Sequence, residues 1–262
     1  MLKPPVPDPG NSALFLDIDG TLVEHAAHPD AVRVHDDLPD LLTGLKRSLG
    51  GAVAFVTGRD LKMVTRLFGD LGLPAAGVFG VERMLGRELE TQSEEALRVA
   101  PVFQALERDC ATLAGVFFEH KGAVLAIHTR AAPETLSEVT ALARAALKSL
   151  PQGYRLIAGH AGVELLPEAA TKSAAIAWFM TRPPFRGRMP VFLGDDTSDE
   201  SGFDWVNRNG GLSVRVRPEG PTEARHALAS VDAVHDWLRR LACAEGSPAR
   251  AGPALRRRTM PV

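Results

Sequence analysis

Short apolar runs alternate along the chain with stretches in which apolar residues recur every three or four positions. The first run covers residues 13–16, and leucines then recur at helical spacing over 38–49. A second apolar run at 52–56 precedes another helical pattern, which reaches Leu67, and a third short run follows at 77–80. Short continuous apolar runs are typical of strands that are buried on both faces. Strands that alternate with helices in this way predict a parallel sheet.

The pattern changes between residues 81 and 169. A hairpin around Gly86 is expected over 81–90, followed by a helix over 91–114 with Thr91 and Glu94 as a capping box. The later expected elements of this stretch are strands at 116–119 and 123–129, a helix at 133–150, and strands at 154–158 and 162–166. The order helix, strand, strand, helix, strand, strand predicts a small α+β unit.

The first pattern returns after Pro167. The expected elements are a helix at 172–180, a strand at 190–193, a helix that ends at 206, a strand at 211–216, and helices at 221–228 and 232–241. We therefore predict an α/β fold in which residues 13–91 and 169–243 form a parallel-sheet core and residues 92–168 form an inserted α+β domain. Residues 1–12 and 244–262 are rich in Pro and in Pro, Gly, Ala and Arg, respectively, and we expect both to be disordered.

Composition narrows the class of protein without indicating a function. The chain has 262 residues, a formal net charge of −2 and 45% hydrophobic residues, as in ordinary globular proteins. A charge so close to zero gives no broad attraction to nucleic acid or to an acidic membrane. The chain shows no signal segment at its N-terminus and no apolar run that could span a bilayer, and Cys110 and Cys243 match no metal-site spacing. We therefore expect a cytoplasmic protein that binds neither nucleic acid nor membrane.

Two carboxylates stand directly after the first apolar run. Asp17 and Asp19 follow it, and Gly20 permits a tight turn or the close approach of a ligand. In open α/β sheets ligands bind at the carboxyl ends of the strands, and paired carboxylates suit Mg²⁺. A calcium loop is excluded because the glycine is fourth rather than sixth in the motif. Aspartates are also common in turns, so this motif alone leaves a purely structural role open.

Three further polar groups stand at comparable places along the chain. They are Thr57-Gly58-Arg59 after the second run, Lys172 at the start of a helix, and Asp195, Asp196 and Asp199 after the run at 190–193. Taken singly, each fits a turn, a surface lysine or a helix cap. Taken together, strand-end acids with a hydroxyl, a lysine and backbone amides fit a divalent cation and a phosphoryl group.

These four motifs, in this order, resemble those of the haloacid dehalogenase superfamily of phosphatases, with Asp17-Ile-Asp19-Gly-Thr-Leu as the first. The resemblance implies a Rossmann-like core in which Asp17 is the nucleophile and forms an aspartyl-phosphate. It implies that Asp19 protonates the leaving oxygen and later activates water. By the same resemblance, Thr57 binds the phosphoryl oxygens, and Gly20, Gly58 and Arg59 line the substrate site.

The resemblance also implies a metal site beside the nucleophile. Lys172 would neutralise charge on the nucleophile and the phosphate, and Asp199 would orient Lys172 or a metal-bound water. Mg²⁺ would be held by Asp17, Asp195 and the backbone carbonyl of Asp19, with Asp196 as a further candidate ligand.

The inserted segment is similar to the type-two cap of sugar phosphatases and, within these, to the trehalose-6-phosphate phosphatase family. The motifs that carry the similarity are Glu119-His-Lys121-Gly and Gly-Val-Glu164-Leu. By this match, Glu119, Lys121 and Glu164 contact sugar hydroxyls, because carboxylates accept hydrogen bonds and ammonium groups donate them. From the residues alone, Glu119 and Lys121 fit an exposed ion pair on a hairpin just as well.

The expected protein is a monomeric, Mg²⁺-dependent phosphatase whose partner is the small molecule trehalose 6-phosphate. The alternatives are a phosphatase for sucrose 6-phosphate or mannosyl-3-phosphoglycerate, a phosphosugar mutase, and a catalytically silent regulatory module. Two positions depart from the family pattern, Phe79 in place of the usual His and Ser173 in place of the Gly that commonly follows the lysine. Any contact that this histidine makes in the family is absent here.

Overall fold

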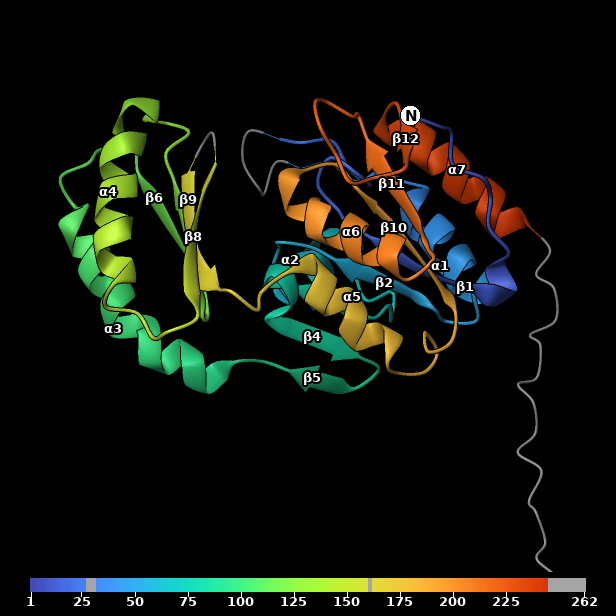
Figure 1. Ribbon diagram of the computed structural model, residues 1–262, viewed down its shortest axis with the longest axis horizontal. Helices are drawn as coiled ribbons and strands as arrows, with labels where there is room; N and C mark the ends of the chain where they lie inside the picture. The colour runs from blue at the N-terminus through green and yellow to red at the C-terminus, as the bar shows by residue number, and fades with distance from the viewer. Residues whose placement is uncertain (27–31, 160–161, 245–262) are drawn as a thin grey trace, which may run out of the picture.

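A large sheet forms the centre of the molecule, and a smaller sheet lies to one side of it (Figure 1). The computed structural model describes residues 1–26, 32–159 and 162–244. The strands of the large sheet are β1 (Ser12–Leu16), β2 (Val53–Val56), β3 (Ala75–Gly77), β4 (Glu82–Leu85), β5 (Glu88–Glu90), β10 (Met189–Gly194), β11 (Leu212–Val216) and β12 (His226–Leu228).

The strand order of the large sheet is β12-β11-β10-β1-β2-β3-β4-β5. Neighbouring strands from β12 to β3 run parallel, and β4 and β5 add an antiparallel hairpin at the edge. The predicted parallel sheet and the predicted hairpin are therefore confirmed. Because β1 lies between β10 and β2, the carboxyl ends of these three strands are adjacent.

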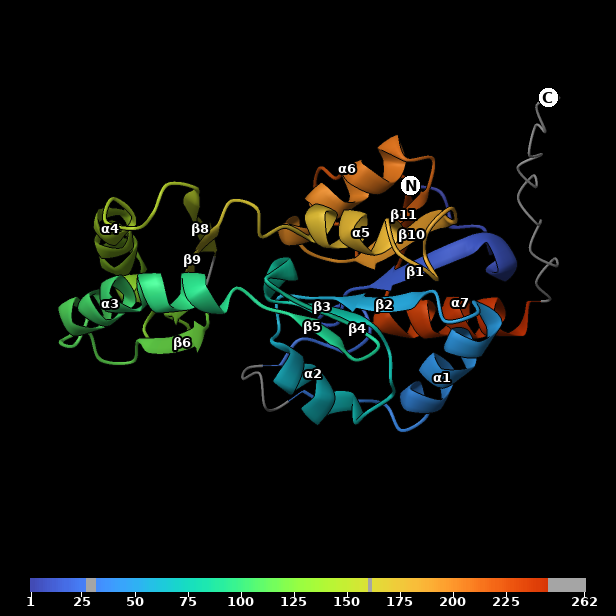
Figure 2. The same ribbon diagram turned by 90° about the horizontal axis from the view of Figure 1, so that it is seen from below.

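Helices cover both faces of the large sheet (Figure 2). They are α1 (Leu38–Ser48), α2 (Leu61–Phe68) and α7 (Val231–Cys243) on one face and α5 (Lys172–Met180) and α6 (Glu200–Arg208) on the other. On β1, Leu14 and Leu16 join the core under α1 and α7, whereas Ala13 and Phe15 join the core under α5 and α6. A strand buried on both faces needs an apolar residue at every position, which explains the continuous apolar run.

The smaller sheet is formed by the segment between β5 and α5. Its strands are β6 (Phe117–Lys121), β7 (Val124–His128), β8 (Tyr154–Gly159) and β9 (Gly162–Pro167), and its helices are α3 (Ser93–Asp109) and α4 (Leu136–Leu147). The strand order is β6-β7-β9-β8, with antiparallel neighbours. In Figure 1, β8 and β9 lie toward the large sheet and α4 lies on the far side. The element order agrees with the α+β unit expected from the sequence.

The N-terminal segment does not follow the expectation of disorder. Leu2 forms a bridge with His226 of β12, and the Trp237 indole donates a hydrogen bond to the Pro5 carbonyl at 3.2 Å. Residues Pro9–Asn11 form a short 3₁₀ helix that leads into β1. The expectation failed because it treated proline only as a breaker of secondary structure, whereas Pro4, Pro7 and Pro9 are buried apolar rings here.

Two expected helices also differ from the structure. Residues 221–228 were expected to be helical, but His226–Leu228 is the edge strand β12, which pairs in parallel with β11. Helix α3 is shorter than 91–114, and the Thr91 hydroxyl bonds Ser93 instead of capping the helix. The expected disorder of the C-terminal tail concerns residues 244–262, of which 245–262 lie outside the described residues. No helix in the described part of the chain is both long enough and apolar enough to cross a bilayer.

Candidate active site

The polar residues that follow the central strands meet at one edge of the large sheet. Asp17 follows β1, Thr57 follows β2, and Asp195 follows β10. Lys172 is the first residue of α5, whose start is capped by the Thr171 side chain through a hydrogen bond from the Ala174 amide at 3.1 Å. These residues line one cavity of about 940 Å³, which also reaches residues of the smaller sheet. The convergence predicted from the strand-end positions is therefore confirmed.

A buried lysine joins two carboxylates at the floor of this cavity. The Lys172 ammonium donates hydrogen bonds to Asp17 Oδ1 at 2.8 Å and to Asp199 Oδ1 at 2.5 Å. The second Asp17 oxygen accepts a hydrogen bond from the Thr21 hydroxyl at 3.3 Å. Asp199 Oδ2 accepts from the backbone amides of Asp195 and Asp196, which fixes the loop after β10. Asp17 is thus held at both oxygens, and it is only 4% exposed.

The charges in this cluster are not balanced. Burial raises the pKa of Asp17 well above its usual value, the Lys172 charge opposes that rise, and the carboxylates of Asp199 and Asp195 add to it. Burial also raises the pKa of Asp199, and the charge of Lys172 again opposes this rise. Burial lowers the pKa of Lys172, but the two carboxylates outweigh it and hold that pKa above its usual value. Lys172 contacts Asp17 and Asp199, while His25 and Arg217 approach Asp195 Oδ2 at 2.9 Å and 3.9 Å. A cation between Asp17 and Asp195 would stabilise the cluster further.

The arrangement of Asp195 fits a metal ion. Carboxylate oxygens of Asp17, Asp195 and Asp199 lie within 4.8 Å of one another. Asp195 Oδ1 is buried and has no hydrogen-bond partner, which is costly for a carboxylate unless a ligand is bound to it. A Cβ atom at position 20 would lie 1.9 Å from Asp195 Oδ2, and Gly20 has a φ of +73°. Only glycine therefore lets the loop after β1 approach Asp195 so closely. Oxygen ligands in this number suit a hard divalent cation.

Asp196 was expected to be a candidate metal ligand, but its side chain has another contact in the structure. Its Oδ1 accepts a hydrogen bond from the Thr197 amide at 2.6 Å and so caps the 3₁₀ helix Thr197–Asp199. Among the described residues, the acidic cluster contains Asp199 in its place. The sequence did not distinguish these roles because each of the two aspartates follows the same strand.

Asp19 does not join the acidic cluster but pairs with Arg59. The guanidinium donates to the two Asp19 oxygens, from Nε at 2.6 Å and from Nη2 at 2.6 Å. Such a two-point pair fixes the plane and direction of the carboxylate. Arg59 itself is held in the turn after β2, where its backbone amide donates to the Thr57 hydroxyl at 3.1 Å. The two expected substrate residues Thr57 and Arg59 therefore lie on one turn, beside the expected acid.

Gly58 and Phe79 are matched to each other. A side chain added at position 58 would lie 2.8 Å from the Phe79 ring, so the glycine makes room for the ring. Val78 and Phe79 have φ values of +49° and +55°, in the left-handed region that L-residues seldom adopt. Phe79 lines the cavity at the point where the family commonly has a histidine, and it places an apolar ring there.

The expected sugar-binding residues of the inserted segment line the same cavity from the opposite side. Glu119 Oε2 lies 3.2 Å from the Lys121 ammonium and 2.9 Å from His128 Nε2, and Lys121 also reaches the Gly58 carbonyl at 3.3 Å. Burial raises the pKa of Glu119, but the His128 hydrogen bond and Lys121 outweigh it and lower that pKa to about 2. Burial raises the pKa of Glu164, whereas the charges of Lys121 and His128 oppose this rise. Glu119 and Lys121 thus form an ion pair on the hairpin, and this pair lines the cavity.

The residues that escaped the sequence analysis include two that approach the metal-site residues, His25 and Arg217. His25 Nε2 lies 2.9 Å from Asp195 Oδ2, and this hydrogen bond raises the pKa of His25. Arg217 donates to the Gly20 carbonyl at 3.2 Å and pairs with Glu24 at 2.6 Å. Arg217 directly follows β11, so the strand-end rule that found Asp195 could have found it. No sequence signal points to His25.

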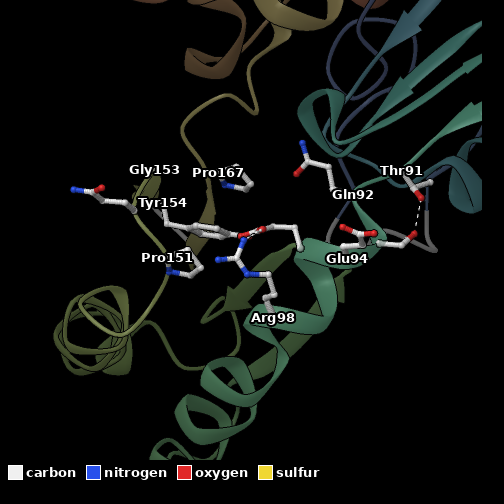
Figure 3. Close-up of a pocket in the computed structure, with 11 residues that line it drawn as sticks. Thr91, Gln92, Glu94, Arg98, Pro151, Gly153, Tyr154 and Pro167 are labelled. Carbon is white, nitrogen blue, oxygen red and sulfur yellow. Dashed lines mark hydrogen bonds and ion pairs between the residues drawn. The ribbon is translucent and has the colours of Figure 1, made fainter.

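A second cavity, of about 750 Å³, lies where α3 and β8 begin (Figure 3). Arg98 lines it and pairs with Glu95 at 3.0 Å, and the Tyr154 hydroxyl donates to the Ala123 carbonyl at 3.0 Å. None of the residues predicted for the site lines this cavity. The cavity at the strand ends is therefore the candidate active site.

Comparisons with known proteins agree on one family. A family model described as trehalose-phosphatase matches residues 15–233. A probable trehalose-phosphate phosphatase of Sinorhizobium fredii is 41% identical over 240 residues, which cover 90% of this chain and 89% of that protein. The trehalose-6-phosphate phosphatase of Escherichia coli is 38% identical over 234 residues, which cover 86% and 85%, respectively. A solved trehalose-6-phosphate phosphatase related protein matches with a TM-score of 0.70 at 22% identity, over 88% of this chain and 96% of that one, which shows a common fold.

Proposed function

This chain belongs to the trehalose-phosphatase family, and from that premise we propose that it hydrolyses trehalose 6-phosphate to trehalose and phosphate with Mg²⁺ as cofactor. The observation that carries the proposal is the two-sided cavity. Its floor holds a buried Asp17 bonded to Lys172, and its opposite wall presents Glu119, Lys121 and Glu164. A charged phosphate binds the first set, and sugar hydroxyls suit the second.

Asp17 is the proposed nucleophile. One of its oxygens attacks phosphorus, the bond from phosphorus to the sugar oxygen breaks, and the phosphoryl group is left on Asp17. Lys172 lies 2.8 Å from Asp17 Oδ1, where it offsets the negative charge of the carboxylate and the incoming phosphate. Water then attacks the phosphoryl group, which leaves as phosphate and restores Asp17. No redox change occurs in either step.

Asp19 is the proposed acid and base. It gives a proton to the departing sugar oxygen and later accepts one from the attacking water, so the two steps balance. In the structure, Arg59 holds both oxygens of the Asp19 carboxylate. A phosphate group that enters the cavity competes with Asp19 for this guanidinium, because Arg binds phosphate in the same two-point manner. Substrate binding would thereby free the Asp19 carboxylate from Arg59, so that Asp19 becomes available for proton transfer when phosphate is in the cavity.

The cofactor proposal rests on the residues around Asp195. Asp17, Asp195 and the backbone carbonyl of Asp19 would hold Mg²⁺, which when bound would neutralise charge on the phosphate oxygens. Asp199 would position Lys172 and the loop after β10, since its oxygens accept hydrogen bonds from that lysine and from two backbone amides. Replacing Asp195 with Ala is expected to lower the affinity for Mg²⁺ at least about tenfold in titration calorimetry, because it removes the ligand with an unpaired oxygen. Asp196→Ala is the matched control and is expected to leave the affinity unchanged, since Asp196 caps a 3₁₀ helix. A fall in affinity with Asp196→Ala alone would reverse these two assignments.

The substrate proposal is tested at Glu119. Glu119→Gln should lower kcat/KM for trehalose 6-phosphate by about 10- to 1000-fold, because charge-assisted hydrogen bonds to the sugar are lost. Hydrolysis of para-nitrophenyl phosphate should stay within about twofold of the parent, because that small ester contacts only the floor of the cavity.

A control on the helix that packs behind this strand separates this effect from damage to the fold. Glu107 of α3 pairs at 3.3 Å with His120, which alternates with Glu119 along β6, and neither Glu107 nor His120 lines the cavity. Glu107→Gln is expected to leave both substrates unaffected. An equal loss on both substrates with Glu119→Gln, or no loss on either, would contradict a sugar-binding role.

The remaining parts of the proposal concern the domain organisation, the oligomeric state and the cellular compartment of the protein. Residues 92–168 are proposed to act as a cap over the core, because the chain leaves the large sheet after β5 and returns to it at α5. A monomer is proposed, since residues of the large and the smaller sheet of one chain together line the cavity from both sides. Both cysteines are unpaired, Cys110 buried and Cys243 exposed, which fits the reducing cytoplasm.

A further inference from the structure

An exposed aromatic ring stands in the wall of the active-site cavity. Phe117 of β6 lines the cavity although its side chain is 63% exposed. Of the large apolar side chains that are exposed in the described part of the chain, it is the only aromatic one and the only one in this cavity. An exposed apolar ring inside a polar cleft is a common mark of a binding contact.

The position of Phe117 follows from the alternation of strand β6. Phe117, Glu119 and Lys121 share the face that lines the cavity, because side chains two apart on a strand point the same way. The intervening residues Phe118 and His120 face α3, where Phe118 packs in the core and His120 meets Glu107. The three cavity residues therefore form one continuous row.

This row runs outward from the core. Lys121 is at the inner end, since its ammonium reaches the Gly58 carbonyl in the turn after β2. Phe117 is four positions away, which on a strand is about 13 Å. A phosphate bound at Asp17 would place the first sugar ring beside Lys121 and Glu119. The second ring of a disaccharide would then lie beside Phe117.

Small residues and two larger side chains, His128 and Arg130, line the cavity at the Phe117 end. Gly115 and Ala131 line the cavity next to it, and a side chain at position 115 would contact Ala132 at 3.0 Å and Ala131 at 3.5 Å. On the core side, the Ala26 carbonyl accepts a hydrogen bond from Arg130 at 3.1 Å, which brings the two walls together at this end. The ring of Phe117 is supported by His128, with centroids 5.9 Å apart. This end of the cavity therefore offers the exposed face of an aromatic ring beside small residues.

We propose that Phe117 forms an apolar platform for the second, unphosphorylated sugar ring and so selects a disaccharide phosphate over a monosaccharide phosphate. One face of a pyranose ring carries carbon-bound hydrogens, which are apolar and slightly positive. They pack favourably on the negative face of an aromatic ring, and they bury it from water. This inference rests on the proposed function, since it assigns a part of the same substrate.

The test compares two substrates in the full-length protein with Mg²⁺. Phe117→Ala should lower kcat/KM for trehalose 6-phosphate by about 10- to 50-fold, while kcat/KM for glucose 6-phosphate stays within about twofold. Phe117→Tyr keeps the ring and should stay within about threefold of the parent on both substrates. Leu97→Ala removes an apolar side chain of α3 that is 77% exposed but outside the cavity, and it should change neither value.

Product inhibition gives a second measurement. With Phe117→Ala, the inhibition constant for trehalose should rise in step with the loss of kcat/KM, whereas that for inorganic phosphate should not change. If the parent prefers the disaccharide phosphate and Phe117→Ala keeps this preference, the platform is overturned and the proposed function stands. If the parent shows no preference for trehalose 6-phosphate, the proposed function is overturned and the platform with it.

Discussion

Asp17→Asn is expected to abolish turnover while the protein remains folded. The carboxamide has the same shape as the carboxylate and still fits between Lys172 and Thr21, but its oxygen is far too weak a nucleophile to attack phosphorus. Loss of a covalent nucleophile typically costs several orders of magnitude, so kcat for trehalose 6-phosphate should fall at least about 10⁴-fold. A small aryl phosphate should lose activity equally, because every substrate must react at this atom.

The measurement is the steady-state release of phosphate, with circular dichroism and thermal melting to confirm the fold. Asp204→Asn is a suitable control, since Asp204 lies on α6 and pairs only with Arg208 in the interactions that the structure gives for it. It should leave activity unchanged. Residual activity of Asp17→Asn above about one per cent of the parent would assign the nucleophile to another group.

Lys172→Met is expected to damage both stability and activity. Lys172 is 2% exposed and is the only cation in hydrogen-bond contact with Asp17 and Asp199 among the described residues. Without it, two buried carboxylates keep only neutral hydrogen-bond donors and have no compensating cation, which should reduce the free energy of unfolding by about 3–5 kcal/mol near neutral pH. Activity should fall at least about 1000-fold, since charge neutralisation at the nucleophile is lost.

The stability loss in Lys172→Met should depend on pH in a known direction. Burial already raises the pKa of Asp17 and Asp199, and the Lys172 charge opposes this rise, so its removal raises both pKa values further. A carboxyl with a raised pKa binds its proton more tightly in the folded state, so its contribution to stability is present at low pH and is lost as pH rises through the folded pKa.

Urea unfolding in EDTA at several pH values measures this dependence. The deficit of Lys172→Met relative to the parent should be smaller at pH 5 than at pH 8. Lys148→Met removes an exposed lysine at the end of α4 and should show no such deficit. A deficit that is the same at both pH values would mean that the two carboxylates are not the source of the lost stability.

The floor of the site could be predicted from sequence because strand ends carry its residues. A buried strand needs a continuous apolar run, so the position of Asp17 at the end of β1 and of Thr57 at the end of β2 can be read directly. Parallel pairing then brings these ends together without further information. Lys172 was found by its motif, and its contact with Asp17 could only be seen in three dimensions.

The parts that could not be predicted depend on contacts distant in sequence. His25 lies on a loop without a regular pattern, and only its hydrogen bond to Asp195, 170 residues away, gives it a place in the site. Residues 221–228 have the composition of a helix, yet pairing with β11 makes His226–Leu228 a strand, since tertiary contacts override local propensity. Phe117 was predicted only as part of a strand, because its exposure and the cavity beside it are properties of the fold.

The central claim is that this protein is a Mg²⁺-dependent phosphatase specific for trehalose 6-phosphate. The most direct test is the initial rate of phosphate release from trehalose 6-phosphate, sucrose 6-phosphate and glucose 6-phosphate, each with Mg²⁺ and with EDTA. We predict that kcat/KM for trehalose 6-phosphate exceeds that for either other ester by at least about 100-fold, and that release stops in EDTA. Equal rates on the three esters, or release that persists in EDTA, would contradict the claim.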